Sequence, residues 1–267
     1  MLVCLFLSSL TRLLFFCAAG IFCAYELSTK LELLDVHCSL WVLVGYLIGQ
    51  GIAVFCGLGI SFYCAWYIFC VYMALLSGIL RKKVKGNGAL DTVAGLTYPC
   101  ALFGIMLIIA KSDIWLETLS LACISSWACD SFALFGGKRF GKHKLAPAIS
   151  PNKTVEGCIC GAISSLVAGA LVWILAQICG GSVFGNAYKE ISLTVCVITA
   201  LIASTLGQMG DLVESLLKRM IGIKDFSNLI PGHGGMFDRA DSLIFAIPTT
   251  YFCLRLALGQ ISPLLRL

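Results

Sequence analysis

From Cys38 to Leu80 the chain is apolar almost throughout, which is longer than one membrane-spanning helix requires. A helix of about 20 apolar residues is enough to cross the hydrocarbon core of a bilayer. The stretch therefore predicts two spans, divided near Cys56 to Gly59. Hydrophobic residues make up 59% of the 267-residue sequence and charged residues only 12%, about half the charged share of a soluble domain. These values exclude an ordinary soluble protein. They predict an all-α polytopic membrane protein, a bundle of about eight to nine transmembrane helices with a polar site.

Similar apolar runs recur along the chain. We predict eight spans, at residues 2–24, 38–57, 59–80, 96–110, 114–135, 157–179, 191–209 and 242–258; dividing 38–80 or 211–222 differently would give nine. No base precedes Arg12 in the first run, so we expect a retained span rather than a cleaved signal peptide. Residues 25–37 are expected to be a polar connector, and residues 81–95 and 136–149 basic loops. Ser150 and Pro151 suit the N-cap and first position of the next helix.

The basic loops predict an orientation in the membrane. Loops rich in Lys and Arg face the cytoplasm, which places residues 81–95 and 136–153 on that side. Counting spans onward returns the chain to the same side at Asp211. We therefore expect a multi-pass protein of the cell (inner) membrane whose charged segments face the cytoplasm.

The first charged segment runs from Asp211 to Asp241. If it begins as a helix, Asp211, Glu214 or Ser215, and Lys218 share one face, and Asp238 and Asp241 are likewise three residues apart. Carboxylates of this kind suit Mg²⁺, which commonly takes one or two of them together with substrate phosphates. The candidate metal ligands are Asp211, Asp238 and Asp241.

The same segment also offers groups that bind phosphate. Glycines around His233 let the backbone approach a ligand closely and present N–H groups to an anion. The bases, which suit phosphate by their charge, are Lys218, Arg219, Lys224 and Arg239. The plainer alternative is a hydrated loop whose charges neutralise one another.

The second charged segment follows Asp130. An acid inside a predicted span is a functional candidate, because an unpaired charge there costs at least a few kcal/mol; the alternative is a helix-end acid paired with Lys138 or Arg139. After it come bases, glycines and hydroxyls ahead of a helix start, an arrangement that suits a triphosphate. An ordinary positive-inside loop is the alternative for this segment. Its candidate binding residues are Lys138, Arg139, Lys142, Lys144, Ser150, Lys153, Thr154 and Glu156.

Together these segments resemble a known family. The first contains Ser215-x-Leu-Lys-Arg-x4-Lys-Asp-x-Ser-x2-Ile-Pro-x-His-Gly-Gly-x-x-Asp-Arg-x-Asp241, and the second Asp130-Ser-Phe-Ala-x2-Gly-Gly-Lys-Arg-Phe-Gly-Lys-x-Lys-Leu-Ala-Pro-x-Ile-Ser-Pro-Asn-Lys-Thr-x-Glu-Gly157. Both strings resemble the signature of the phosphatidate cytidylyltransferases, or CDP-diacylglycerol synthases. Ala240 departs from the larger apolar residue usual there, and Leu134 from a common Tyr. The resemblance covers roughly residues 125–245.

The resemblance implies an activity. Such enzymes transfer the cytidylyl group of CTP to phosphatidate in phospholipid biosynthesis, giving CDP-diacylglycerol and pyrophosphate. They require Mg²⁺, and a monovalent cation such as K⁺ can share the site. A homodimer in lipid, with no nucleic-acid partner, is implied. We would then place residues 1–95 in an N-terminal transmembrane region and residues 96–267 in a catalytic transmembrane region of one integral membrane domain.

Residue roles carry over from the resemblance as follows. Asp211 and Asp238 would be metal ligands with Asp241 and Asp130 close by. The catalytic set would be Asp211, Lys218, Arg219, Lys224, Asp225, His233, Asp238, Arg239 and Asp241. The substrate-binding set would be Asp130, Ser215, Gly234, Gly235 and the eight binding residues of the second segment named above.

Three alternatives stay open. A CTP-dependent kinase of a lipid alcohol such as a polyprenol would share the membrane, CTP and Mg²⁺, but would release CDP instead of pyrophosphate. A transporter using Asp130 as its coupling site would be favoured by inverted repeats, and we find none. A non-catalytic membrane scaffold would not need this cluster of acids and bases.

Overall fold

A computed structural model describes residues 8–80, 88–179, 181–227 and 234–259. The chain forms two compact units. Unit 1 comprises Met1–Ser112 and Met220–Arg239, and unit 2 comprises Asp113–Arg219 and Ala240–Leu267. Each unit is described by itself below.

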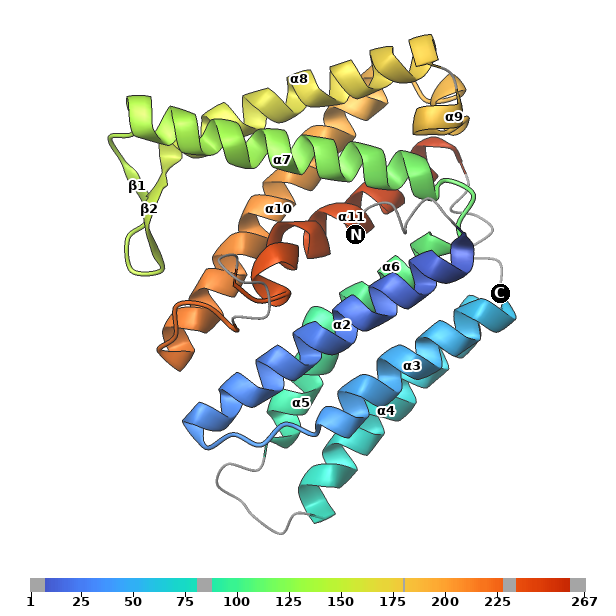
Figure 1. Ribbon diagram of the computed structural model, residues 1–267, viewed down its shortest axis with the longest axis vertical. Coiled ribbons are helices and arrows are strands. Elements are labelled where there is room, and N and C mark those ends of the chain that lie inside the picture. The colour runs from blue at the N-terminus through green and yellow to red at the C-terminus, as the bar shows by residue number, and fades with distance from the viewer. Residues whose placement is uncertain (1–7, 81–87, 180, 228–233, 260–267) are drawn as a thin grey trace. The chain divides into compact units, whose positions relative to one another are not determined.

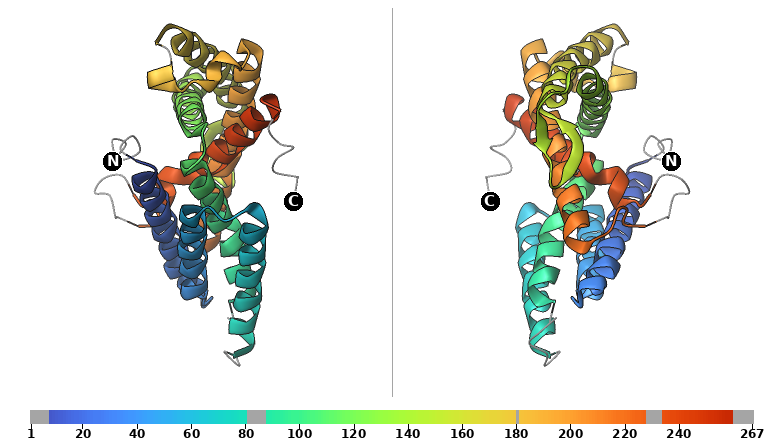
Figure 2. Two further views of the ribbon diagram at one scale, coloured as in Figure 1. Left: turned by 90° about the vertical axis from the view of Figure 1, so that its right-hand side faces the viewer. Right: turned by 90° about the vertical axis from the view of Figure 1, so that its left-hand side faces the viewer.

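Unit 1 is built from helices that follow one another along the chain. They are α2 (Ser9–Leu31), η1 (Glu32–Leu34), α3 (Leu40–Cys56), α4 (Ile60–Leu80), α5 (Ala89–Gly95), the π-helical segment η2 (Leu96–Ala101) and α6 (Leu102–Ala110). Helix α2 packs against α3 and α6, and α3 packs against α4 (Figures 1 and 2). The prediction of a polar connector at residues 25–37 is wrong at its start, because α2 continues to Leu31 and buries Glu26.

The predicted break in the long apolar stretch is confirmed. Helix α3 ends at Cys56 and α4 begins at Ile60. Gly57 adopts a left-handed conformation with φ of 74°, which glycine reaches without a steric penalty. The amine of Lys111 donates to the carbonyls of Val54 (3.1 Å) and Phe55 (3.0 Å), and so satisfies two acceptors in the last turn of α3.

The next apolar segment is longer than predicted. Helix α5 starts at Ala89 after Gly88, whose φ is 72°, and continues through η2 into α6. Residues 89–95, expected in a basic loop, are therefore helical. Tyr98 leaves helical geometry immediately before Pro99. Proline lacks the backbone N–H that a regular helix would use, which accounts for the irregular segment at this point.

Unit 2 contains two long paired helices joined by a small hairpin. Its elements are α7 (Trp115–Phe140), β1 (Lys144–Ala146), β2 (Ser150–Thr154), α8 (Val155–Cys179), α9 (Gly181–Phe184), η3 (Ala187–Lys189), most of α10 (Leu193–Ile221) and most of α11 (Phe237–Ala257). The ribbons of α7 and α8 lie side by side in all three views (Figures 1 and 2).

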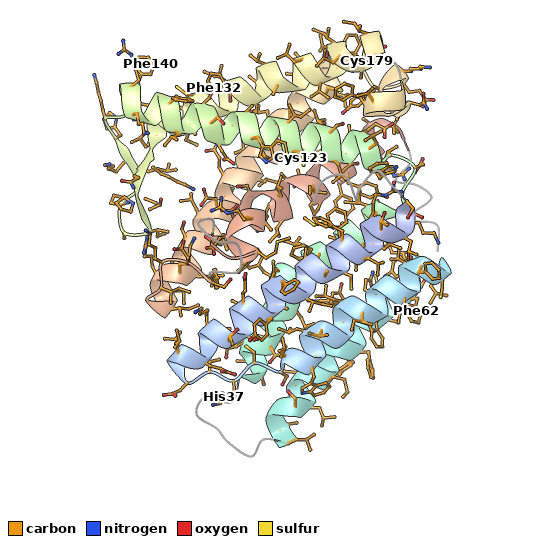
Figure 3. All side chains as sticks on the ribbon, in the orientation of Figure 1. His37, Phe62, Cys123, Phe132, Phe140 and Cys179 are labelled. Atoms are coloured by element: carbon orange, nitrogen blue, oxygen red, sulfur yellow. The ribbon has the colours of Figure 1, made fainter. Side chains whose placement is uncertain are left out.

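Glycines allow α7 and α8 to approach closely. A Cβ added at Gly157 would lie 2.6 Å from the carbonyl oxygen of Ala133, and one at Gly161 would lie 2.8 Å from that of Cys129. Small residues at such contacts are typical of helix pairs in membranes. Away from this contact both helices expose apolar side chains, including Phe132 on α7 (Figure 3).

The segment between α7 and α8 differs from the prediction. Residues 136–149 were expected to form a basic loop, but α7 runs on to Phe140 and therefore carries Lys138 and Arg139. Ser150 was expected to cap a helix, but residues 150–154 form the antiparallel strand β2, paired with β1. The cap of α8 is Thr154, whose Oγ1 accepts the N–H of Gly157 at 3.1 Å. The hairpin is a β element in a chain predicted to be all-α.

Within the described residues, each predicted span falls on helical structure, and the chain is a polytopic helical membrane protein. Residues 2–7 of the first predicted span lie outside the described residues. Among the described residues, six helical segments are long and apolar enough to cross a membrane: Ser9–Leu34, Ile60–Leu80, Ala89–Ala110, Trp115–Phe140, Val155–Cys179 and Leu193–Ile221. Helix α3 is apolar but has only 17 residues. Helix α11 is not among the six. Charged residues at both of its ends, including Asp238, Asp241 and Arg255, lower its hydropathy.

Candidate active site

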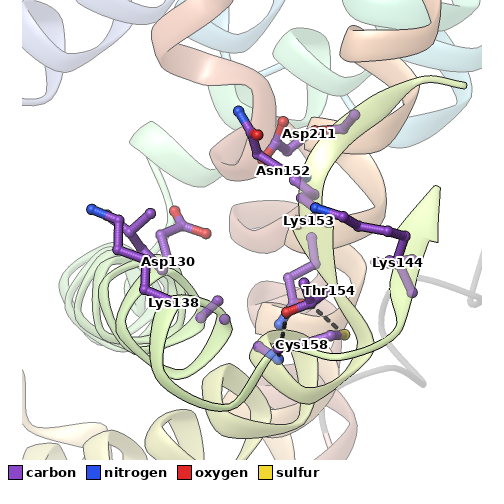
Figure 4. A pocket seen from close by; sticks show the side chains of 16 residues that line it. Asp130, Lys138, Lys144, Asn152, Lys153, Thr154, Cys158 and Asp211 are labelled. Carbon is purple, nitrogen blue, oxygen red and sulfur yellow. Dashed lines mark hydrogen bonds and ion pairs between the residues drawn. The ribbon is translucent and has the colours of Figure 1, made fainter. Parts of the chain in front are cut away.

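A cavity of about 670 Å³ opens in unit 2, with walls from α7, the hairpin, α8 and α10. Three lysines and two aspartates line it together with hydroxyl and amide side chains (Figure 4). Seven predicted site residues lie in its wall: Asp130, Lys138, Lys144, Ser150, Lys153, Thr154 and Asp211. The fold thus gathers residues from both charged segments around one cavity.

The hairpin places polar side chains in the cavity wall, and hydrogen bonds at its base hold it in position. The Glu156 carboxylate accepts the backbone N–H groups of Lys142 (3.0 Å) and His143 (3.2 Å) and contacts His143 Nδ1 at 2.6 Å. These bonds close the chain between α7 and α8. Glu156 was predicted to bind substrate, and in the structure it holds the hairpin.

An ion pair connects the hairpin to α10. Lys153 Nζ lies 2.6 Å from Asp211 Oδ2, and each side chain is a little under one third exposed (28% and 29%). Because both groups remain in contact with solvent at the cavity wall, a phosphate or a cation can reach them. The hydroxyl of Ser215, one turn later on α10, lies 3.4 Å from Asp211 Oδ1.

Three carboxylates meet beside this ion pair. Oxygens of Asp211, Glu214 and Asp241 all lie within 4.8 Å of one another. Three carboxylate oxygens at this separation suit a hard divalent cation such as Mg²⁺. Glu214 has no exposed side-chain surface, and its Oε2 pairs with Lys218 Nζ at 2.6 Å. The chemistry of the donor set therefore fits the predicted metal, with Glu214 added and Asp238 absent from this group.

Glycine brings α10 and α11 together at the cluster. A Cβ at Gly210 would lie 2.6 Å from the backbone oxygen of Asp241, and one at Gly207 would lie 3.3 Å from that of Ser242. The two glycines are three residues apart, so they share a face of α10. The neighbouring carboxylate of Asp241 accepts the N–H and hydroxyl of Ser242.

The other predicted residues of unit 2 lie outside the lining of this cavity. Arg219 donates from Nε to the carbonyl of Ile149 at 3.1 Å, which ties α10 to the hairpin tip. Arg139 and Lys142 are exposed at the end of α7 and just beyond it.

The remaining predicted residues belong to unit 1. Lys224, Asp225 and Arg239 are exposed. Asp238 Oδ2 accepts the backbone N–H of Phe226 (3.0 Å) and of Gly235 (2.8 Å), so this aspartate closes a turn of the backbone. Gly234 has φ of 81°, a conformation that favours glycine. His233 lies outside the described residues.

Some residues of the acidic cluster and of the cavity wall were not selected from the sequence. Glu214 shares a face with Asp211 and Lys218, and this spacing could have marked it as a ligand. Gln208 and Cys158 line the cavity, with Cys158 Sγ 2.6 Å from Gln208 Oε1. Both residues lie in apolar runs, and the sequence pattern there does not indicate a binding site.

Comparisons of the sequence with known proteins give a family match and several named relatives. The sequence model of the cytidylyltransferase family matches residues 1–257. The phosphatidate cytidylyltransferase of Bacillus subtilis (strain 168) is 38% identical over 194 residues, covering 71% of this chain and 67% of the relative. The enzyme of that name from Rickettsia felis (strain ATCC VR-1525 / URRWXCal2) is 36% identical over 214 residues, covering 68% of this chain and 91% of the relative. The one from Haemophilus influenzae (strain ATCC 51907 / DSM 11121 / KW20 / Rd) is 44% identical over 122 residues, covering 46% of this chain and 40% of the relative.

Proposed function

Because this chain belongs to the cytidylyltransferase family, we propose that it is a phosphatidate cytidylyltransferase. It transfers the cytidylyl group of CTP to phosphatidate, giving CDP-diacylglycerol and pyrophosphate. The observation that carries the proposal is the pairing of two chemistries at one cavity: the carboxylates of Asp211, Glu214 and Asp241 meet beside it, and Lys138, Lys144 and Lys153 line it.

The reaction is a substitution at phosphorus. An oxygen of the phosphatidate phosphate forms a bond to the α-phosphorus of CTP, the bond from that phosphorus to the bridging α–β oxygen breaks, and pyrophosphate leaves with the bonding electrons. The nucleophile is already an anionic phosphate oxygen, so no strong general base is needed. Catalysis then consists mainly of orienting two anions and stabilising the charge that develops between them.

The lysines of the cavity suit that task. Lys138 on α7 and Lys144 and Lys153 on the hairpin offer positive charge from different elements, so together they can hold a triphosphate against a phosphate monoester. The ion pair with Asp211 orients the Lys153 amine. Thr154 and Asn152 add a hydroxyl and an amide to the same wall.

The acidic cluster would hold Mg²⁺ through Asp211, Glu214 and Asp241. Bound there, the ion would supply charge neutralisation at the phosphates. Asp238 stays a predicted ligand from the sequence, and K⁺ stays a predicted second cation. We also propose that the site faces the cytoplasm, where CTP is available, and that the protein acts as a homodimer.

The position of a radioactive label tests the function directly. Purified protein is incubated with phosphatidate, Mg²⁺ and CTP carrying the label on either the α- or the γ-phosphate. Cytidylyl transfer moves the α-label into lipid and the γ-label into pyrophosphate. A lipid kinase would do the reverse, placing the γ-label in lipid and releasing CDP, and that result with a lipid alcohol would overturn the proposal. The Asp211→Asn variant serves as the inactive control.

A further inference from the structure

A buried carboxylate in the first described helix contacts a distant part of the chain. Glu26 lies near the end of α2 and is 4% exposed. A charged side chain in such an apolar helix is costly unless it is well paired. Glu26 lies about a hundred residues before the first of the two motif strings, which begins at Asp130.

Both oxygens of Glu26 bind the start of α11. Oε1 accepts the N–H of Met236 at 3.0 Å, and Oε2 accepts the N–H of Phe237 at 2.8 Å. The hydroxyl of Ser227 donates to Oε1 at 2.5 Å. The first N–H groups of a helix have no partner within the helix, and a carboxylate is favoured there by the helix dipole. Glu26 thus caps α11 from another helix.

Gly235, which precedes the capped helix start, lies against the same carboxylate. A Cβ at Gly235 would lie 2.6 Å from Glu26 Oε1 and 2.8 Å from Oε2. Real Cβ atoms do not approach this closely, so any larger residue would displace either the backbone or Glu26. The absence of a side chain at Gly235 therefore lets the carboxylate reach the helix start.

Asp238 is held by the same turn. It lies on α11 one residue after Phe237, and its Oδ2 accepts the N–H groups of Gly235 and Phe226. The Phe226 and Phe237 rings pack 4.7 Å apart between centroids, and both are fully buried. Together Glu26 and Asp238 therefore accept the backbone N–H groups of three consecutive residues, Gly235 to Phe237.

We propose that Glu26 is a positioning residue for the transfer reaction, acting through the segment Gly235–Asp238. Its carboxylate sets the place of the Gly235 backbone, and through it that of Asp238, so that this aspartate is held in one fixed geometry. This inference rests on the proposed function. Displacement of such groups by about 1 Å can cost on the order of 100-fold in rate.

The test uses the full-length protein in detergent or nanodiscs. Glu26→Gln keeps the size of the side chain but removes the charge and places an amide donor against backbone donors. Glu26→Asp keeps the charge on a shorter stem. Glu32→Gln, an exposed acid six residues later, is the matched control. Two measurements are made: hydrogen–deuterium exchange of peptides covering residues 234–238, and kcat with the Mg²⁺ concentration that gives half-maximal rate.

For Glu26→Gln we expect faster exchange at residues 234–238, a fall in kcat of roughly 10- to 100-fold per folded molecule, and a higher Mg²⁺ requirement. Glu26→Asp should recover part of the lost kcat, and Glu32→Gln should match the parent protein. If Glu26→Gln does not fold, the same two measurements are made on Glu26→Asp and Gly235→Ala. Combining those two changes should restore some activity to Gly235→Ala, because the shorter acid leaves room for the new Cβ.

Two results would overturn the inference. One is activity that falls only in proportion to the folded fraction, with an unchanged Mg²⁺ requirement. The other is unchanged exchange at residues 234–238. If the parent protein forms no CDP-lipid, the proposed function fails, and the exchange measurement still decides whether Glu26 holds the segment.

Discussion

Lys153 Nζ and Asp211 Oδ2 lie 2.6 Å apart across the wall of the cavity. One residue comes from a β-strand and the other from a helix, and 57 residues separate them in the sequence. The contact joins a group that suits phosphate to a group that suits a divalent cation. We propose that the two substrates and the metal meet at this contact.

Replacing Lys153 by Ala should lower kcat/KM for CTP by about 100-fold, because removing one preorganised charge from a transition state costs on that order. Lys153→Arg should retain part of the activity. Lys189→Ala, an exposed base in η3 that does not line this cavity, is the control. Steady-state rates at several CTP concentrations check the prediction, and normal kinetics in Lys153→Ala would remove this residue from the site.

The Asp211→Asn and Asp241→Asn changes should each abolish turnover while the protein still inserts into membranes. Each change removes a charged oxygen from the cluster, so any residual turnover should need more Mg²⁺ than the parent protein needs. Adding EDTA to the parent protein should also stop the reaction, and excess Mg²⁺ should restart it. The exposed acid Glu190 provides the control as Glu190→Gln. Appreciable activity in Asp241→Asn at low Mg²⁺ would contradict its place in the cluster.

Glu214→Gln should lower both stability and activity. Breaking a buried ion pair leaves the partner charge uncompensated, at a cost of about 3 kcal/mol or more. The partner here is Lys218, whose side chain is 16% exposed. The double change Glu214→Gln with Lys218→Met should recover thermal stability but not turnover. Recovery of both would mean that Glu214 serves only to balance Lys218.

Gly210→Ala should impair both activity and stability. Its Cβ would meet the Asp241 backbone, and the resulting shift between α10 and α11 would widen the carboxylate cluster. Overpacking of this kind typically costs about 1–3 kcal/mol, while we expect the loss in kcat to reach at least roughly 10-fold. Gly45→Ala on α3 is the matched control because its added Cβ would meet nothing within 4 Å. Equal activity in the two variants would show that the approach at Gly210 has no functional role.

The sequence was sufficient for the membrane class and for the approximate positions of the long helices, although several of their ends were wrong. Long apolar runs have few alternatives, because backbone groups inside a bilayer must be satisfied within a helix or a closed sheet. The split between α3 and α4 followed from length and from glycine. The motif residues of both charged segments also followed from the sequence, because their spacing resembles a known signature.

Local polar patterns were misleading where distant residues provide the partners. Ser150 and Pro151 match the residue preferences of a helix start, yet they lie in β2. Hydrogen bonds of Glu156 and Arg219 hold that segment as a hairpin. Glu26 lies in a segment predicted to be a polar connector. It is nevertheless buried, because backbone N–H groups at the start of α11 donate to its carboxylate. No local rule contains these partners.

By itself, then, the sequence determined a polytopic helical membrane protein and the two charged segments that resemble cytidylyltransferase motifs. The thickness of the bilayer and the need to satisfy backbone hydrogen bonds constrain each short stretch of chain separately. The composition and spacing of residues within a stretch are therefore enough to identify a membrane helix. Only the tertiary structure decided which acids meet and which base faces them. The meeting of Asp211, Glu214 and Asp241 depends on how closely α10 and α11 approach at Gly210, and that distance is set by packing between segments far apart in the chain.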